Sequence, residues 1–205
     1  MTDARDPGPD SNDLAFLKAL VSEAPRVQRR TGLIFLIAGG LYGAQCLLFW
    51  LQFKGFVPQA LGLWITIAPT ALLLLAIGWI GFKDRHKPKG GVAQRALEAA
   101  WGSAGLTNLF MLIVLAYVSY TEKNFTYWLL YAVMVCIVQG SVWYIAAMIR
   151  RKLWLGIVSA GWFLCALGTG LTLRHLDLYI LIMAAALFLL MALPGWIMYR
   201  QPKEA

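Results

Sequence analysis

The sequence predicts an all-α fold: a polytopic membrane bundle of six transmembrane helices, preceded by a short amphipathic helix. Hydrophobic residues make up 60% of the chain and charged residues only 14%, whereas about half and about a quarter are usual in soluble domains. Apolar segments of roughly 20 residues recur along the chain, and a helix of that length spans a hydrocarbon core about 30 Å thick. Basic residues gather in alternate connections between these segments. Together these features predict an integral membrane protein.

Residues 1–31 are predicted to form a cytoplasmic tail that contains the amphipathic helix. Small polar residues at positions 11–13 can cap this helix, and Pro25 is expected to end it. A helix of this kind typically lies on the membrane surface with its apolar face in the interface. The apolar residues at helical spacing are Leu14, Leu17, Leu20 and Val21.

Residues 32–199 are predicted to form the transmembrane domain, and residues 200–205 a second cytoplasmic tail. The apolar segments are not strands of a barrel, because barrel strands are about ten residues long and alternate in polarity. Helices satisfy their own backbone groups in lipid and are therefore expected. The segments are Gly32 to Phe53, Gln59 to Phe82, Ala96 to Tyr120, Phe125 to Ile149, Leu153 to Leu173, and Leu178 to Tyr199.

The basic residues predict the orientation. Fifteen of the 18 Lys and Arg residues lie in the two tails and in the second and fourth connections. Lys54, Lys123 and Arg174 stand alone in the first, third and fifth connections. Because cytoplasmic loops carry an excess of Lys and Arg, both termini are expected in the cytoplasm of a bacterial inner membrane. The basic loops are expected to attract anionic lipid headgroups. Their scatter, without a stripe of interleaved aromatic residues, excludes a nucleic-acid partner.

Small and kinking residues suggest how the helices pack. Gly39 and Gly43 form a GxxxG pattern, which lets two helices approach closely. We expect their partner to be another span of the same chain, with a homodimer seam as the alternative. Pro69 and Pro194 each remove one backbone hydrogen bond and are expected to kink their helices.

Few polar side chains fall inside the apolar segments, so each needs a partner. Asn108 and Gln139 lie near the middle of the third and fourth segments. One interpretation joins them by an interhelical hydrogen bond worth about 1 kcal/mol. The other makes Asn108, Gln139 and Thr107 the polar floor of a ligand pocket at the midplane.

Glu98 is the acidic residue that begins a span near the cytoplasmic side. Arg95 lies one turn before it, and Arg150 ends the neighbouring span on the same side. We expect an interfacial ion pair among these three residues, with a proton-relay role for Glu98 as the alternative.

No catalytic or metal-binding pattern is visible. The sequence has no GxSxG, HExxH or Walker motif, and no cofactor is expected. The three cysteines form no CxxC pair and are interpreted as small buried apolar residues. A membrane enzyme would depend on Glu98 as its acid or base, and we rank this class below the others.

Three stretches carry a whole-length resemblance to small uncharacterised bacterial six-span membrane proteins. They are Asp13 to Phe16, Arg95 through Trp101-Gly102, and Pro194-Gly195 with Arg200-Gln201-Pro202. The resemblance implies the six-span topology and the arrangement of the tails, and it assigns no functional residue.

Two function classes follow from the sequence. The first is a noncatalytic membrane protein that senses, binds or scaffolds a protein partner or a small apolar ligand within the bilayer. The second is a small transporter, expected to be dimeric, for an apolar or weakly polar solute with a site near Asn108 and Gln139. A water-accessible cavity that reaches the midplane between the two halves of the bundle would favour the transporter, and a sealed core would favour the sensor or scaffold.

Overall fold

The computed structural model describes the backbone of residues 9–83 and 92–200 and the side chains of residues 29–82 and 94–200. All elements in these ranges are helices, and no strand occurs among them. The all-α prediction is confirmed for this part of the chain.

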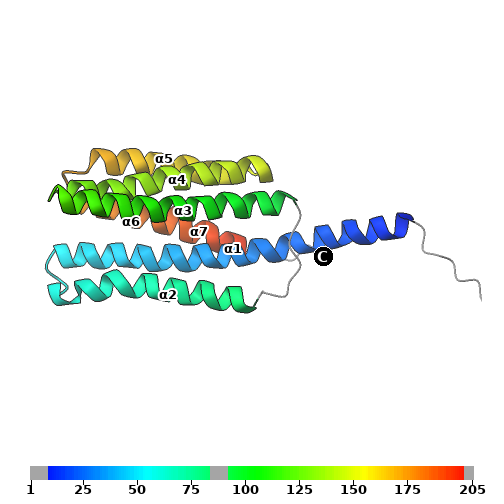
Figure 1. Cartoon of the computed structure of the whole chain (residues 1–205), viewed down its shortest axis with the longest axis horizontal. Coiled ribbons are helices and arrows are strands. Elements are labelled where there is room, and N and C mark those ends of the chain that lie inside the picture. The colour runs from blue at the N-terminus through cyan, green and yellow to red at the C-terminus, as the bar shows by residue number, and fades with distance from the viewer. Residues whose placement is uncertain (1–8, 84–91, 201–205) are drawn as a thin grey trace, which may run out of the picture.

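The chain passes along the bundle six times (Figure 1). The last pass is one continuous rod made of α6, the π-helix η2 and α7. The elements are α1 (Pro9–Phe53), the 3-10 turn η1 (Gln59–Leu61), α2 (Gly62–Lys83), α3 (Val92–Thr121), α4 (Thr126–Arg150), α5 (Leu153–Leu171), α6 (Leu176–Ala186), η2 (Leu187–Ala192) and α7 (Leu193–Arg200).

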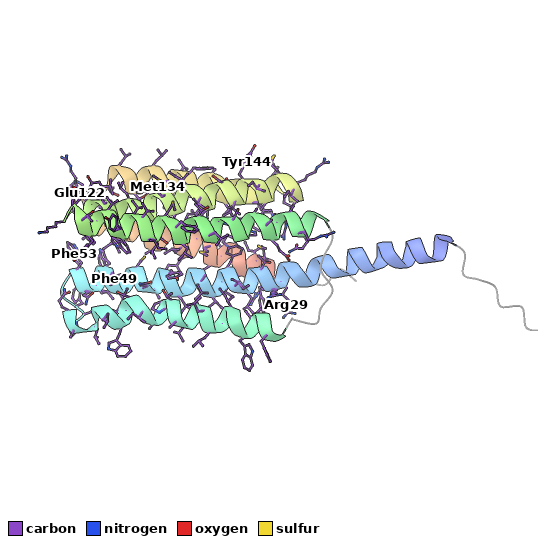
Figure 2. All side chains as sticks on the ribbon, in the orientation of Figure 1. Arg29, Phe49, Phe53, Glu122, Met134 and Tyr144 are labelled. Carbon is purple, nitrogen blue, oxygen red and sulfur yellow. The ribbon has the colours of Figure 1, made fainter. Side chains whose placement is uncertain are left out.

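Six of the described stretches are long and apolar enough to cross a membrane, and their bounds lie within a few residues of the predicted segments. They are Arg29–Phe53, Gln59–Phe82, Gln94–Thr121, Thr126–Arg150, Leu153–Leu171 and Leu176–Arg200. We call the end of the bundle at Arg29 the basic end, and the end at Phe53 and Glu122 the opposite end (Figure 2).

The predicted end of the first helix at Pro25 is wrong. α1 is a single helix of 45 residues that runs through Pro25 into the first apolar segment. Figure 1 shows its amino-terminal part extending past the bundle. A proline removes one helical hydrogen bond but does not forbid the helix, and where the helix stands clear of its neighbours water can bond to the freed carbonyl. The predicted amphipathic face of this segment lies outside the described side chains.

α1 and the last pass form the tightest contact in the bundle. α1 packs against α6, η2, α7 and α2, whereas α4 packs chiefly against α5 and α3. A Cβ built on Gly39 would lie 2.5 Å from the amide nitrogen of Ala192. A Cβ on Gly43 would lie 2.9 Å from the ring of Phe188, and one on Gly195 would meet the amide nitrogen of Leu36. The GxxxG pattern therefore meets another span of the same chain.

Trp162 on α5 makes a hydrogen bond to the backbone close to Pro194. Pro194 lies just after the π-helix, and the indole nitrogen of Trp162 donates a hydrogen bond of 3.2 Å to the carbonyl of Leu190. Leu190 is four residues before Pro194, so its carbonyl is the one to which an amide at position 194 would bond in an α-helix. Trp162 is only 1% exposed. The side chain thus supplies the donor that the proline removes.

Pro69 lies within α2, which runs on without interruption to Lys83. The hydroxyls beside it make local bonds. Thr66 donates to the carbonyl of Gly62 over 2.8 Å, and Thr70 lies 3.3 Å from the hydroxyl of Tyr42 on α1. The second of these bonds ties α2 to α1 across their interface.

Large apolar side chains cover the outside of the bundle (Figure 2). Soluble monomers rarely expose contiguous apolar patches larger than a few hundred Å². On α2 the exposed apolar side chains follow nearly its whole length, which suits hydrocarbon as the surrounding medium. They include Leu63, Trp64, Ile67, Leu72, Leu74, Leu75 and Trp79.

Candidate functional site

A cavity of about 330 Å³ lies between α1, α3 and α4, starting from the basic end. On α3 the residues that line the cavity are spaced three or four positions apart. Residues at this spacing lie on one face of a helix. These α3 residues include Gln94, Glu98, Trp101, Gly105 and Asn108. From Gln94 to Asn108 the helix rises by roughly 20 Å at 1.5 Å per residue. The cavity therefore extends from the basic end to the middle of the third span.

Asn108 and Gln139 both line this cavity, as the sequence suggests. They do not bond to each other. Neither Oδ1 of Asn108 nor Oε1 of Gln139 has a hydrogen-bond partner among the described residues, and both atoms are buried. A buried acceptor without a donor costs about 1–3 kcal/mol. The predicted hydrogen bond between the two helices is thus absent, and two polar groups remain available to a bound molecule.

An aromatic cluster forms one wall. Phe35 on α1 and Trp101 on α3 line the cavity, with ring centroids 4.5 Å apart. Trp143 on α4 lies behind them, its centroid 5.2 Å from Phe35 and 5.3 Å from Trp101. Such close, tilted aromatic pairs are worth about 0.5–1.5 kcal/mol beyond their area burial. The wall is therefore a packed surface against which a planar or apolar group can stack.

The expected ion pair between Glu98 and an arginine, at the basic end of the cavity, is not present among the described residues. Glu98 and Arg150 both line the cavity, and Arg95 is exposed on α3. Instead of pairing with either arginine, Glu98 accepts a hydrogen bond of 3.1 Å from Nε2 of Gln94, one turn earlier on the same helix. An exposed ion pair contributes about 0–1 kcal/mol, so little is lost when it does not form. The mouth thus presents one carboxylate and one guanidinium to the cavity.

Thr107 does not join Asn108 and Gln139. It is exposed and lines a separate depression between α3 and α4, together with Phe110, Met111 and Met134. At about 100° per residue, Thr107 is rotated from Asn108 away from the centre of the face that lines the cavity. The predicted three-residue polar floor is reduced to two residues.

Sequence reasoning missed a second cavity, of about 500 Å³, at the opposite end between α1, α4 and α6. Its aromatic residues fall near helix ends, where aromatic side chains are common in membrane proteins, and the sequence does not reveal which way each helix turns them. The aromatic residues are Phe49, Phe53, Phe125, Trp128, Tyr131 and Tyr179. Gln52 is 6% exposed and donates a hydrogen bond of 3.0 Å to the carbonyl of Pro58, bracing the turn beside the cavity.

No protein-family model, no curated protein and no solved structure matches the chain. Within the described ranges, no three His, Cys, Asp or Glu residues gather closely enough to hold a metal ion. The first cavity contains a single carboxylate among its lining residues and no nucleophile–base pair. The cavity offers two amide side chains for hydrogen bonding and an aromatic wall.

Proposed function

We propose that this protein is a multi-pass protein of the bacterial inner membrane that binds a small, weakly polar ligand in the cavity between α1, α3 and α4. The observation that carries this proposal is the pair of unpartnered amides, Asn108 and Gln139, at the inner limit of that cavity. A ligand that hydrogen-bonds to them offsets the cost of burying them. The aromatic wall favours a ligand with a planar or apolar body.

The location in the membrane rests on three supports. Six stretches are long and apolar enough to span it. The outer faces of the helices are apolar, and the basic residues alternate between connections as the positive-inside rule requires. This orientation puts both termini and the cavity mouth on the cytoplasmic side, where the basic loops meet anionic headgroups or a protein partner.

Replacing Asn108 or Gln139 by Leu is expected to abolish ligand binding while leaving the bundle folded, because removing an unpartnered polar group costs no hydrogen bond. The measurement is mass analysis of small molecules that copurify with the protein in mild detergent, together with thermal unfolding. We expect the retained compound to be lost from both variants and kept in the matched control Thr107→Leu, one residue away on another face of α3.

Three results would contradict this prediction. The first is the same copurified compounds in all variants, and the second is no specific small molecule in the parent protein. The third is a large loss of stability in Asn108→Leu or Gln139→Leu, which would show that the amides serve packing instead of binding.

The second candidate function is transport, and the cavity at the opposite end favours it. The two cavities lie on opposite halves of the bundle and share α1 and α4 as walls. On α4 their lining residues are separated only by residues 133–138, about 9 Å of helix at 1.5 Å per residue. A thin packed layer between two cavities suits a transporter that opens one site to each side of the membrane in turn. Flux of the copurified compound into vesicles, lost in Asn108→Leu, separates transport from binding alone.

A further inference from the structure

Three sulfur atoms from three helices meet in the core. The Sγ of Cys136 on α4 lies 3.6 Å from the Sγ of Cys165 on α5 and 3.6 Å from the Sδ of Met183 on α6. The three residues are 0%, 7% and 8% exposed. They are separated by 29 and 47 residues in the sequence, so no motif spacing reveals them. We call them the sulfur cluster.

The two sulfur–sulfur distances are compatible with two sulfurs bonding to one metal ion. Metal–sulfur bonds to cysteine are about 2.3 Å long. Two sulfurs 3.6 Å apart can therefore both bond to one ion, at a sulfur–ion–sulfur angle of roughly 100° for bonds of about 2.3 Å. The second pair, Cys136 and Met183, has the same separation. An ion beside Cys136 can thus bond to Cys136 and to either Cys165 or Met183.

The sulfur ligands determine which type of metal ion is preferred. Thiolate and thioether sulfurs are soft ligands, and this combination favours Cu(I) over the harder divalent ions. The apolar surroundings favour a complex without net charge, because an isolated buried charge is costly. A monovalent ion bound by one cysteine thiolate and the methionine thioether is neutral, and the other cysteine, still a thiol, can donate a hydrogen bond to that thiolate. One proton leaves per ion bound and the oxidation state of the ion does not change, so no oxidant is needed.

The cavity at the opposite end supplies a route to the cluster. Its lining includes Met183, and Cys46 on α1 also lies on its wall. An ion that enters this cavity can therefore reach the thioether of the cluster directly. This route is separate from the cavity that holds Asn108 and Gln139.

We propose that the sulfur cluster is a binding site for a soft monovalent metal ion, Cu(I), reached through the cavity between α1, α4 and α6. This goes beyond the proposed function, since it uses different residues and a different ligand. It also assigns a role to two cysteines that the sequence presents only as apolar residues.

The test is titration of the purified full-length protein in detergent with Cu(I), under a reductant and in competition with a colorimetric chelator. We expect one ion per chain. Because even second-shell changes at metal sites cost about 10–100-fold in affinity, Cys136→Ala and Cys165→Ala should weaken binding by more than about 100-fold. Met183→Leu, which keeps the volume of the side chain, should weaken it to a smaller degree.

Cys46→Ala and Met111→Leu are the matched controls, because they remove sulfurs outside the cluster and should retain binding. Thermal unfolding with and without Ag(I) checks that each variant is folded and gives a second readout, since an ion that binds only the folded state raises the unfolding temperature. That rise should occur in the parent and both controls and be absent from Cys136→Ala.

The proposal fails if the folded parent protein binds no Cu(I). It also fails if the controls lose as much affinity as the cluster variants, or if thiol counting shows a disulfide between Cys136 and Cys165 in the purified protein. Because Asn108→Leu leaves the cluster intact, normal Cu(I) binding by that variant distinguishes failure of the proposed function from failure of this site.

Discussion

Replacing Gly39 by Ala is expected to destabilise the bundle, whereas the same replacement at the adjacent Gly40 is expected to leave stability unchanged or raise it. At Gly39 the new Cβ would lie 2.5 Å from the amide nitrogen of Ala192 and 2.8 Å from the carbonyl oxygen of Leu187. Both are backbone atoms, so the helices must move apart, and overpacking of this kind costs about 1–3 kcal/mol. At Gly40 the new Cβ would meet nothing within 4 Å.

Gly39→Ala should therefore be less stable than Gly40→Ala. Alanine has a higher helix propensity than glycine by about 1 kcal/mol, and this gain is the same at both positions because both lie within α1. Only the contact with the last pass differs. Unfolding in detergent, followed by circular dichroism, measures both. Equal stabilities for the two variants would show that α1 and η2 are not in close contact in the folded protein.

Replacing Trp162 by Phe is expected to destabilise the protein by about 2–3 kcal/mol, which combines a carbonyl left without a donor with partial loss of core volume. The indole nitrogen bonds to the carbonyl of Leu190, and the side chain is almost fully buried between α5 and the last pass. Phenylalanine keeps the aromatic ring but has no donor. Thermal unfolding of the purified variant gives the size of the effect.

Pro194 provides the control that separates the hydrogen bond from the lost volume. In a Pro194→Ala background the backbone regains an amide, and this amide can bond to Leu190 without Trp162. Trp162→Phe should then cost less than it does in the parent chain, and the difference measures the coupling between the two residues. If both backgrounds lose the same stability, Trp162 does not compensate for the proline and acts through packing alone.

The extents of the spans could be predicted closely because apolar length is a local property of the sequence. The first predicted span begins three residues later than the observed stretch and ends at the same residue, Phe53. The partner of Gly39 and Gly43 could also be inferred, since a bundle offers many neighbours within one chain. Pro25 was misjudged because a missing hydrogen bond ends a helix only where nothing else satisfies the freed carbonyl.

The candidate site could be predicted only in part, because which residues meet depends on the rotation of each helix. Asn108 and Gln139 share a cavity since both lie at the same depth on neighbouring helices. Thr107 points elsewhere, and Glu98 bonds to Gln94 instead of an arginine. The sulfur cluster and the cavity at the opposite end each combine residues from three helices whose order around the bundle the sequence does not reveal.

The close contact between α1 and the last pass has a consequence for biosynthesis. The glycine face of α1 leaves the ribosome first, but its partner at Ala192 and Gly195 is made roughly 150 residues later, which takes roughly 8–30 s at 5–20 residues per second. During that interval the face has no partner within its own chain. Until residues 187–195 are made, this face of α1 cannot form its contact, so chains truncated before residue 185 are expected to be digested faster by an added protease than the full chain.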